Sequence, residues 1–303
     1  MFEQTKLMFL YCVTPVHMGA GQAMGVIDNP IQRERHTNYP NMAGSGIKGA
    51  LRHHINGSWE DNLVNRLFGP ESSSSYHAGA ISFGDGQLLA FPVRSLKQAF
   101  VYAVSPTTLA RLKRLAELTD MDTGWEMPRV DSDHAVVCNK RVLNGDKLVL
   151  EAFDYKASES AELKSVGDWI ADNALPQDET HRFFRDKIRA DLVLLPDDAM
   201  IHFVENATLV EAHVCIDDDT GTAKDGGLFY TENLPPETLL IAPVFTSKER
   251  SKNGSLTAAD EVMEKVQEAF DGKLVQFGGD ATTGRGHIVL HFASKKENGE
   301  GQS

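Results

Sequence analysis

The distribution of apolar residues predicts a chain in which strands and helices are interspersed. Residues 7–13 (LMFLYCV) form an unbroken apolar run, which is typical of a strand buried on both faces. Helices are expected where apolar residues recur every three or four positions, and strands where short apolar runs lie between turn residues. These patterns predict helices near 47–55, 63–68, 106–118, 159–175, 180–188 and 258–270, and strands near 80–83, 88–93, 100–104, 147–153, 200–205, 209–216, 228–230, 239–245, 274–277 and 287–292.

The order of these elements favours an α+β fold. A strand, a helix, several strands and a late helix followed by a strand pair match a ferredoxin-like (split βαβ) sheet with one helical face and large insertions. The strands at 209–216 and 228–230 flank a long polar tip, and we expect a hairpin that projects from the body. We expect one domain over residues 1–294 and a flexible tail over 295–303.

Composition and charge narrow the classes of function. The 303 residues are 41% hydrophobic and 24% charged, which excludes a disordered, collagen-like or coiled-coil chain. The net charge is −13, from 30 Lys and Arg against 43 Asp and Glu, so binding to nucleic acid must depend on a local basic patch. Cys12, Cys138 and Cys215 form no CxxC motif, and we expect buried thiols rather than disulfides or a zinc site. With no pattern of a signal peptide or membrane span, we expect a cytoplasmic protein without a membrane partner.

The most specific candidate for binding chemistry is the loop at 278–286 (GGDATTGRG), which lies between two apolar strands. Glycines let a backbone approach a ligand closely, and successive N–H groups can surround an anion. Threonine hydroxyls and an arginine would add phosphate contacts. We therefore expect the loop to bind a phosphate backbone, through Gly278, Gly279, Thr282, Thr283, Gly284 and Arg285. The alternative is a long hairpin with glycines at positive φ, and no mononucleotide or dinucleotide motif is present.

A second candidate is the start of the helix near 47–55, which follows Gly44-Ser45-Gly46. Ser45 is expected to cap this helix, whose N-terminal N–H groups attract anions. Lys48 and Arg52 then lie one turn apart on one face. An ordinary cap and a solvated face explain the same residues, so this pattern gains weight only beside the glycine-rich loop.

The third candidate is the segment 14–42, which is too long and too rich in charged residues for a simple connection. His17 follows the first buried strand, where a structural histidine is the ordinary explanation. Asp28 precedes Asn29-Pro30, where an Asx turn is the ordinary explanation. A carboxylate in such a loop near phosphates can also hold a divalent cation or accept a proton from a ribose hydroxyl.

Taken together, these motifs resemble the RAMP proteins of type III CRISPR effector complexes. In detail they are similar to the family of the fourth Cmr subunit, which is the repeated backbone subunit of the type III-B (Cmr) complex. The similarity extends from Leu7 to Phe292 and is carried, in order, by HMGAG at 17–21, GVIDNPIQR at 25–33, PNMAGSGIKG at 40–49, LFYTENLP at 228–235 and the 278–286 loop.

The resemblance implies an RRM-like palm with an inserted helical region and a thumb hairpin at about 207–230. It implies several copies stacked head to tail along a CRISPR RNA, together with other Cmr subunits, and a metal-dependent endoribonuclease that cuts bound target RNA at regular intervals. Asp28 matches an aspartate that is essential for cleavage, and it would hold Mg²⁺ or Mn²⁺. The resemblance also implies that His17, Tyr230 and Glu232 surround the cut site.

Two other interpretations remain open. The first is a structural RAMP subunit that holds the CRISPR RNA without cutting its target, and the second is a small-molecule phosphate enzyme on a ferredoxin-like fold. A nuclease should lose cleavage but keep RNA binding when Asp28 is replaced. A phosphate enzyme should not co-purify with a discrete small RNA.

Overall fold

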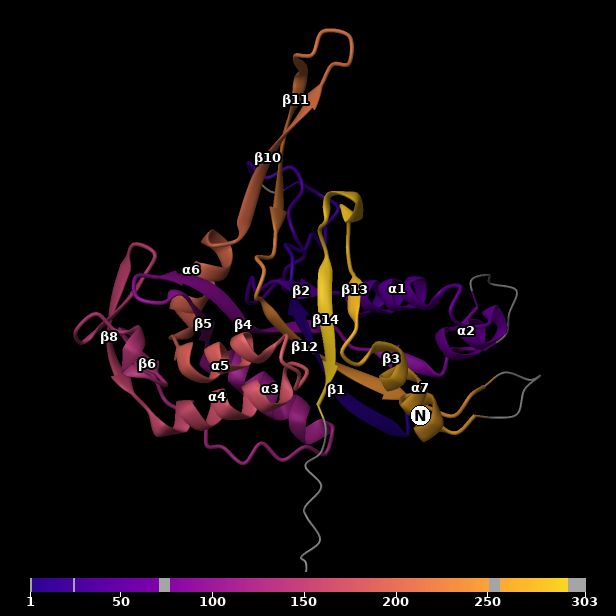
Figure 1. The fold of residues 1–303 in the computed structure, drawn as a ribbon, viewed down its shortest axis with the longest axis horizontal. Coiled ribbons are helices and arrows are strands. Elements are labelled where there is room, and N and C mark those ends of the chain that lie inside the picture. Colours follow the sequence, from indigo (N-terminus) through magenta and orange to yellow (C-terminus); the bar gives the residue numbers. More distant parts are fainter. Residues whose placement is uncertain (1, 24, 71–76, 251–256, 294–303) are drawn as a thin grey trace, which may run out of the picture.

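The computed structural model describes residues 2–23, 25–70, 77–250 and 257–293 (Figure 1). The helices are α1 (Gly44–Ile55), α2 (Asp61–Phe68), α3 (Pro106–Leu118), η1 (Lys140–Val142), α4 (Ala161–Asn173), α5 (Arg182–Asp191), α6 (Asp197–Asn206), α7 (Ala259–Phe270) and η2 (Ala281–Thr283). The strands are β1 (Gln4–Cys12), β2 (Asn41–Met42), β3 (Ile81–Phe83), β4 (Gly86–Ser95), β5 (Ala99–Val104), β6 (His134–Val137), β7 (Lys147–Leu150), β8 (Phe153–Glu159), β9 (Leu192–Leu194), β10 (Leu209–Ile216), β11 (Ala223–Asn233), β12 (Leu239–Thr246), β13 (Leu274–Gln276) and β14 (His287–Phe292).

One long strand, β4, joins two parts of the main sheet. The first part has the order β13-β14-β1-β12-β4, and all its neighbouring strands are antiparallel. The C-terminal half of β4 continues into the series β5-β9-β6-β8-β7, and the pair Ser95–Leu150 brings β7 back to β4. The second part of the sheet is therefore closed into a small barrel of six strands.

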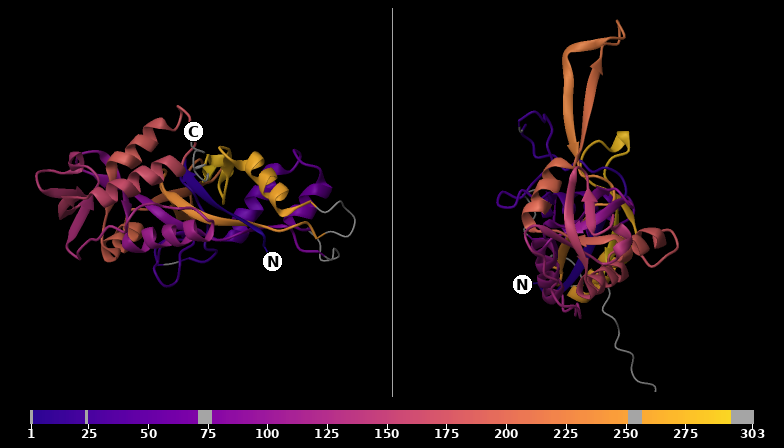
Figure 2. Two further views of the ribbon diagram at one scale, coloured as in Figure 1. Left: turned by 90° about the horizontal axis from the view of Figure 1, so that it is seen from below. Right: turned by 90° about the vertical axis from the view of Figure 1, so that its left-hand side faces the viewer.

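The first strand is buried on both faces, as its unbroken apolar sequence predicts. Met8 and Leu10 belong to one core, which contains side chains from α1, α2, α6 and α7. Leu7 and Phe9 belong to a second core, which contains side chains from α3, α4 and α5. Figure 2 shows helices on both sides of the sheet. The expectation of one helical face is therefore wrong, because a strand that is apolar on both faces needs cover on both.

Two local predictions are also wrong. Residues 200–205, predicted as a strand, lie in α6, where Met200, Phe203 and Val204 are buried at helical spacing. A short apolar run has no period long enough to separate the two structures. Cys215 is exposed, whereas Cys12 and Cys138 are buried as expected, and burial raises the pKa of the Cys138 thiol to about 12. The predicted tail at 295–303 lies outside the described residues.

The predicted hairpin is present and projects from the body (Figures 1 and 2). Its strands, β10 and β11, pair with each other in a separate two-stranded sheet. By their register, Val210, Val214, Leu228 and Tyr230 lie on one face, and each is 38% to 54% exposed. Among the described helices, none combines the length and apolar character that crossing a membrane requires.

Candidate functional site

The segment 14–42 docks along the root of the hairpin. Asn29 forms a parallel bridge to Thr231, because the Asn29 N–H donates to the Tyr230 carbonyl (3.0 Å) and the Glu232 N–H donates to the Asn29 carbonyl (2.9 Å). Nearer to β1, Val16 and Leu234 exchange two backbone hydrogen bonds of 3.0 and 2.9 Å. The segment thus adds short pieces of strand to β11, and the hairpin root fixes its path.

Asp28 lies at the start of this bridge and is exposed. One of its carboxylate oxygens, Oδ2, accepts a hydrogen bond from the Tyr230 N–H at 2.8 Å. This single bond orients the carboxylate and leaves acceptor capacity that faces solvent. The predicted Asx turn is not needed to explain this position, because the side chain binds a residue 202 positions away.

The carboxylate of Asp28 is suited to a cation that arrives with its ligand. Mg²⁺ is usually held by one or two carboxylates together with substrate phosphates and water. Within the described residues, no three His, Cys, Asp or Glu side chains gather into a cluster that could hold a metal by themselves. Asp28 therefore fits a site completed by phosphate oxygens rather than a closed protein cage.

His17 is held against the same stretch of β11. Its Nδ1 lies 2.7 Å from the Glu232 carbonyl oxygen, which can only accept, so Nδ1 carries the proton. In the tautomer that carries its proton on Nδ1, Nε2 is the acceptor. A Cβ at Gly19 would lie 3.0 Å from this Nε2. The structure thus binds His17 and Asp28 to Glu232 and Tyr230, which lie two positions apart on β11, as the sequence prediction grouped them.

Glu232 faces the interior rather than the open surface. Its side chain is 3% exposed, and Oε1 accepts from Arg33 (2.5 Å) and from the Thr208 hydroxyl (2.8 Å). Oε2 accepts from the Ile31 N–H at 3.1 Å. Through these three hydrogen bonds, Glu232 on β11 links the 14–42 segment to Thr208, which directly precedes β10. The carboxylate of Glu232 is thus an anchor in this structure, whereas Tyr230 is 38% exposed beside Asp28.

The glycine-rich loop packs against His17. A Cβ at Gly278 would lie 2.2 Å from the His17 carbonyl oxygen, and the Gly279 N–H donates to that oxygen at 3.0 Å. Gly284 adopts φ +79° with open space where a Cβ would lie. Gly278 is therefore required by contact within the chain, and Gly284 by its backbone conformation.

The outer part of this loop is open to solvent. Thr282 and Thr283 are exposed in the short helix η2, and the Thr283 hydroxyl donates to the Asp280 carbonyl at 2.8 Å. Arg285 reaches across to the hairpin, where its guanidinium lies 2.5 Å from Glu211 Oε2 on β10. The loop, the hairpin root and the 14–42 segment therefore meet at one place (Figure 1).

The start of α1 differs from the prediction. Ser45 is exposed within the first turn and caps nothing, since Ala43 is the N-cap and the Gly44 N–H donates to Asp85 at 2.7 Å. A carboxylate from the β3–β4 turn thus already occupies part of the expected anion site. Ser45 was a reasonable candidate because serine is a common N-cap, but the N-cap lies two residues earlier, at Ala43.

Lys48 and Arg52 lie on one face, as predicted, but bind acceptors within the chain. Lys48 donates to the Ile81 carbonyl at 3.0 Å, and burial, with a smaller contribution from Arg52, lowers the pKa of Lys48. Arg52 donates to the Gly69 carbonyl and, at 2.7 Å, to Asn65 on α2. Arg52 therefore also ties α1 to α2.

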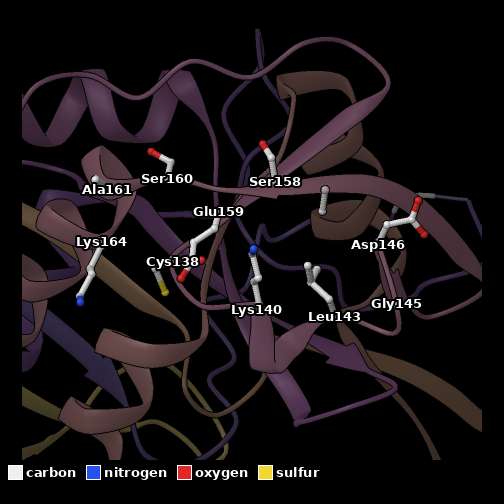
Figure 3. A pocket seen from close by; sticks show the side chains of 11 residues that line it. Cys138, Lys140, Leu143, Gly145, Asp146, Ser158, Glu159, Ser160, Ala161 and Lys164 are labelled. Carbon is white, nitrogen blue, oxygen red and sulfur yellow. The ribbon is translucent and has the colours of Figure 1, made fainter.

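The described surface has a hollow at the site and another, larger one elsewhere. A smaller one of about 260 Å³ adjoins the Asp28 segment and is lined in part by Ile27, Arg33 and Glu232. A larger one of about 740 Å³ lies between β8, α4 and the β7 turn, and Figure 3 shows Lys140, Lys164 and Cys138 around it. The larger hollow contains none of the predicted site residues.

Comparison with known proteins identifies the family to which this chain belongs. A model of the RAMP superfamily matches residues 9–289, so the chain belongs to that superfamily. The CRISPR system Cmr endoribonuclease Cmr4 of Pyrococcus furiosus is 33% identical over 302 residues, which cover 97% of each chain. Within the superfamily, the chain is a member of the Cmr4 family.

Solved structures agree with this placement. Oligomeric Cmr4 from Pyrococcus furiosus superposes with a TM-score of 0.73 at 29% identity, covering 96% of this chain and 98% of that one. A chain of the type III-B Cmr-beta complex bound to cognate target RNA has the same fold, with a TM-score of 0.71 at 17% identity and coverage of 96% and 98%. The predicted α+β palm with a protruding hairpin is confirmed.

Proposed function

We propose that the chain is the backbone subunit of a type III-B CRISPR ribonucleoprotein, which binds CRISPR RNA and cleaves complementary target RNA at regular intervals. The observation that carries the proposal is the meeting of Asp28, His17 and the glycine-rich loop at the hairpin root. Its partners are CRISPR RNA, target RNA, neighbouring copies arranged head to tail, and other Cmr subunits. The full-length similarity to a Cmr endoribonuclease supports the same conclusion.

Binding requires little free positive charge per copy. Base pairing between guide and target supplies sequence recognition, so the protein needs to recognise only backbone and shape. The exposed loop residues Gly279, Thr282, Thr283 and Gly284 are available for a phosphate backbone, and Ser45, Lys48 and Arg52 extend this surface along α1. This arrangement reconciles RNA binding with a net charge of −13.

For cleavage, we assign roles to three side chains. RNA is cut when its 2′-hydroxyl attacks the adjacent phosphate in line, which requires geometry, removal of a proton and neutralisation of charge. His17 accepts or returns the proton through Nε2, since Nδ1 is already committed to the Glu232 carbonyl. Tyr230 lies beside the reacting phosphate with an exposed ring. Asp28 would hold Mg²⁺ or Mn²⁺, which supplies positive charge next to the phosphate.

Replacing Asp28 with Asn tests this proposal. We expect D28N to abolish cleavage while target RNA still binds with near-normal affinity, and EDTA should have the same effect on the parent protein. Asp154→Asn, which removes a carboxylate from an exposed ion pair on β8, is the matched control and should cleave normally. Products should end in a 2′,3′-cyclic phosphate or its opened form.

The outcomes separate the competing interpretations. Robust cleavage by D28N, or products with 3′-hydroxyl ends, would exclude the assigned chemistry. RNA binding without cleavage by parent and variant alike would indicate a structural subunit instead. Failure of the parent protein to bind RNA would refute the proposed function as a whole.

A further inference from the structure

One ion pair connects the glycine-rich loop to the hairpin. Arg285 follows the exposed turn of the loop, and its guanidinium lies 2.5 Å from Glu211 Oε2 on β10. The Asn233 amide donates to the same oxygen at 3.3 Å, so Glu211 keeps a second partner on β11. The two charged side chains are 21% and 29% exposed, and therefore both remain accessible from solvent.

This pair differs from the other basic contacts of the expected RNA surface. Lys48 and the Arg52–Gly69 contact use uncharged carbonyl oxygens, which leave the positive charge in place for a nearby phosphate. Glu211 instead neutralises the guanidinium of Arg285 and presents a negative charge at the same point. A phosphate that approaches Arg285 must displace this carboxylate or lie beside it, and like charges repel.

We infer that Glu211 competes with RNA phosphate for Arg285 and thereby lowers the affinity of this chain for any isolated RNA. The inference rests on the proposed RNA-binding function. This loss of affinity is the same for every RNA, so it does not depend on the RNA sequence. RNA that contacts a single subunit does not displace Glu211 from Arg285. The summed contacts of a guide held along several copies supply enough binding free energy to do so.

The affinity for RNA of the Glu211→Gln variant tests this inference. Glutamine keeps the size of the side chain and its hydrogen-bonding oxygen but removes the charge. The full chain is titrated with a labelled single-stranded RNA of guide sequence, and with an unrelated RNA of equal length, over a range of KCl concentrations. We expect E211Q to bind both RNAs roughly fivefold more tightly at low salt, since an exposed ion pair is worth up to about 1 kcal/mol.

Salt dependence and a second substitution identify the cause. The slope of log K against log[KCl] should become steeper by up to about 0.7, which corresponds to one more phosphate contact on a single strand. The double variant E211Q/R285Q should lose the gain. Glu179→Gln removes a glutamate from the exposed pair with Arg182 and changes the net charge equally, so it should leave the affinity unchanged.

Each outcome decides between the two claims. RNA binding by the parent chain that E211Q leaves unchanged or weakens would overturn the inference and leave the proposed function intact. An equal gain in E179Q would also overturn it, because net charge alone would then explain the effect. Absence of RNA binding by parent and variants alike would overturn the proposed function and, with it, this inference.

Discussion

The buried pair between Arg33 and Glu232 leads to a prediction that separates support from chemistry. We consider Glu232→Gln and Arg33→Met. The Glu232 side chain is 3% exposed and accepts three hydrogen bonds. Glutamine at this position would point its N–H₂ group at a donor and leave the buried charge of Arg33 without a counter-charge. Removing one partner of a buried ion pair costs about 3–5 kcal/mol, and we expect E232Q and R33M each to lose about that much. The double variant should lose clearly less than the sum.

The assay combines urea unfolding, followed by circular dichroism, with RNA cleavage well below the unfolding midpoint. Ile31, one of the donors to Glu232, lies three residues from Asp28, so both single variants should displace the Asp28 segment and slow cleavage. Tyr230→Phe is the control that should leave stability unchanged, because the ring is exposed. The reasoning is refuted if E232Q keeps full stability yet abolishes cleavage while R33M cleaves normally, since Glu232 would then act on RNA directly.

Three further predictions concern the binding surface and pH. The double substitution Lys48→Ala/Arg52→Ala should weaken guide binding and make it less dependent on KCl concentration. It should also lower the melting temperature, because Arg52 links α1 to α2. An unchanged salt slope would contradict a phosphate contact. Gly284→Val should cost about 1–2 kcal/mol of stability in urea unfolding, because φ is +79°, and RNA binding should fall further than this loss explains if the loop contacts phosphate. Burial raises the pKa of Glu237 to about 7, so the folded state binds more protons than the unfolded state between pH 4.5 and 7. Stability should therefore fall by about 2 kcal/mol, after allowance for solvent screening, as pH rises through this window; E237Q should abolish that dependence, and a pH profile identical to the parent's would refute the assignment.

The elements with a strong local signal could be predicted from the sequence. The apolar run of β1, the helix that begins at Pro106 behind Ser105, and the hairpin with its polar tip all depend on neighbouring residues. The strand predicted at 200–205 failed because three apolar residues fit either period until the whole helix is in view. Local pattern thus determines an element only where the run is long or capped.

The partners within the site could not be predicted, because they lie far apart in the sequence. Asp28 and His17 were candidates by residue type, but their bonds to Tyr230 and Glu232 span 202 and 215 positions. Glu211 and Asp85, which neutralise the expected anion contacts, have no sequence signal of their own. Tertiary structure supplied these acidic partners, and it also placed Glu232 in the interior.

The hairpin has a consequence for the chain before assembly. Beyond the root, where the 14–42 segment pairs with β11, each strand of the hairpin pairs only with the other among the described residues, and one face carries exposed Val210, Val214 and Leu228. This combination promotes edge-to-edge association. The acidic run at 217–219 and the charged pair at 224–225 lie at the tip, where like charges on neighbouring copies repel each other. Newly made subunits in excess of RNA and partners should nonetheless aggregate through the hairpin, so that the supply of RNA limits how much soluble subunit a cell can keep.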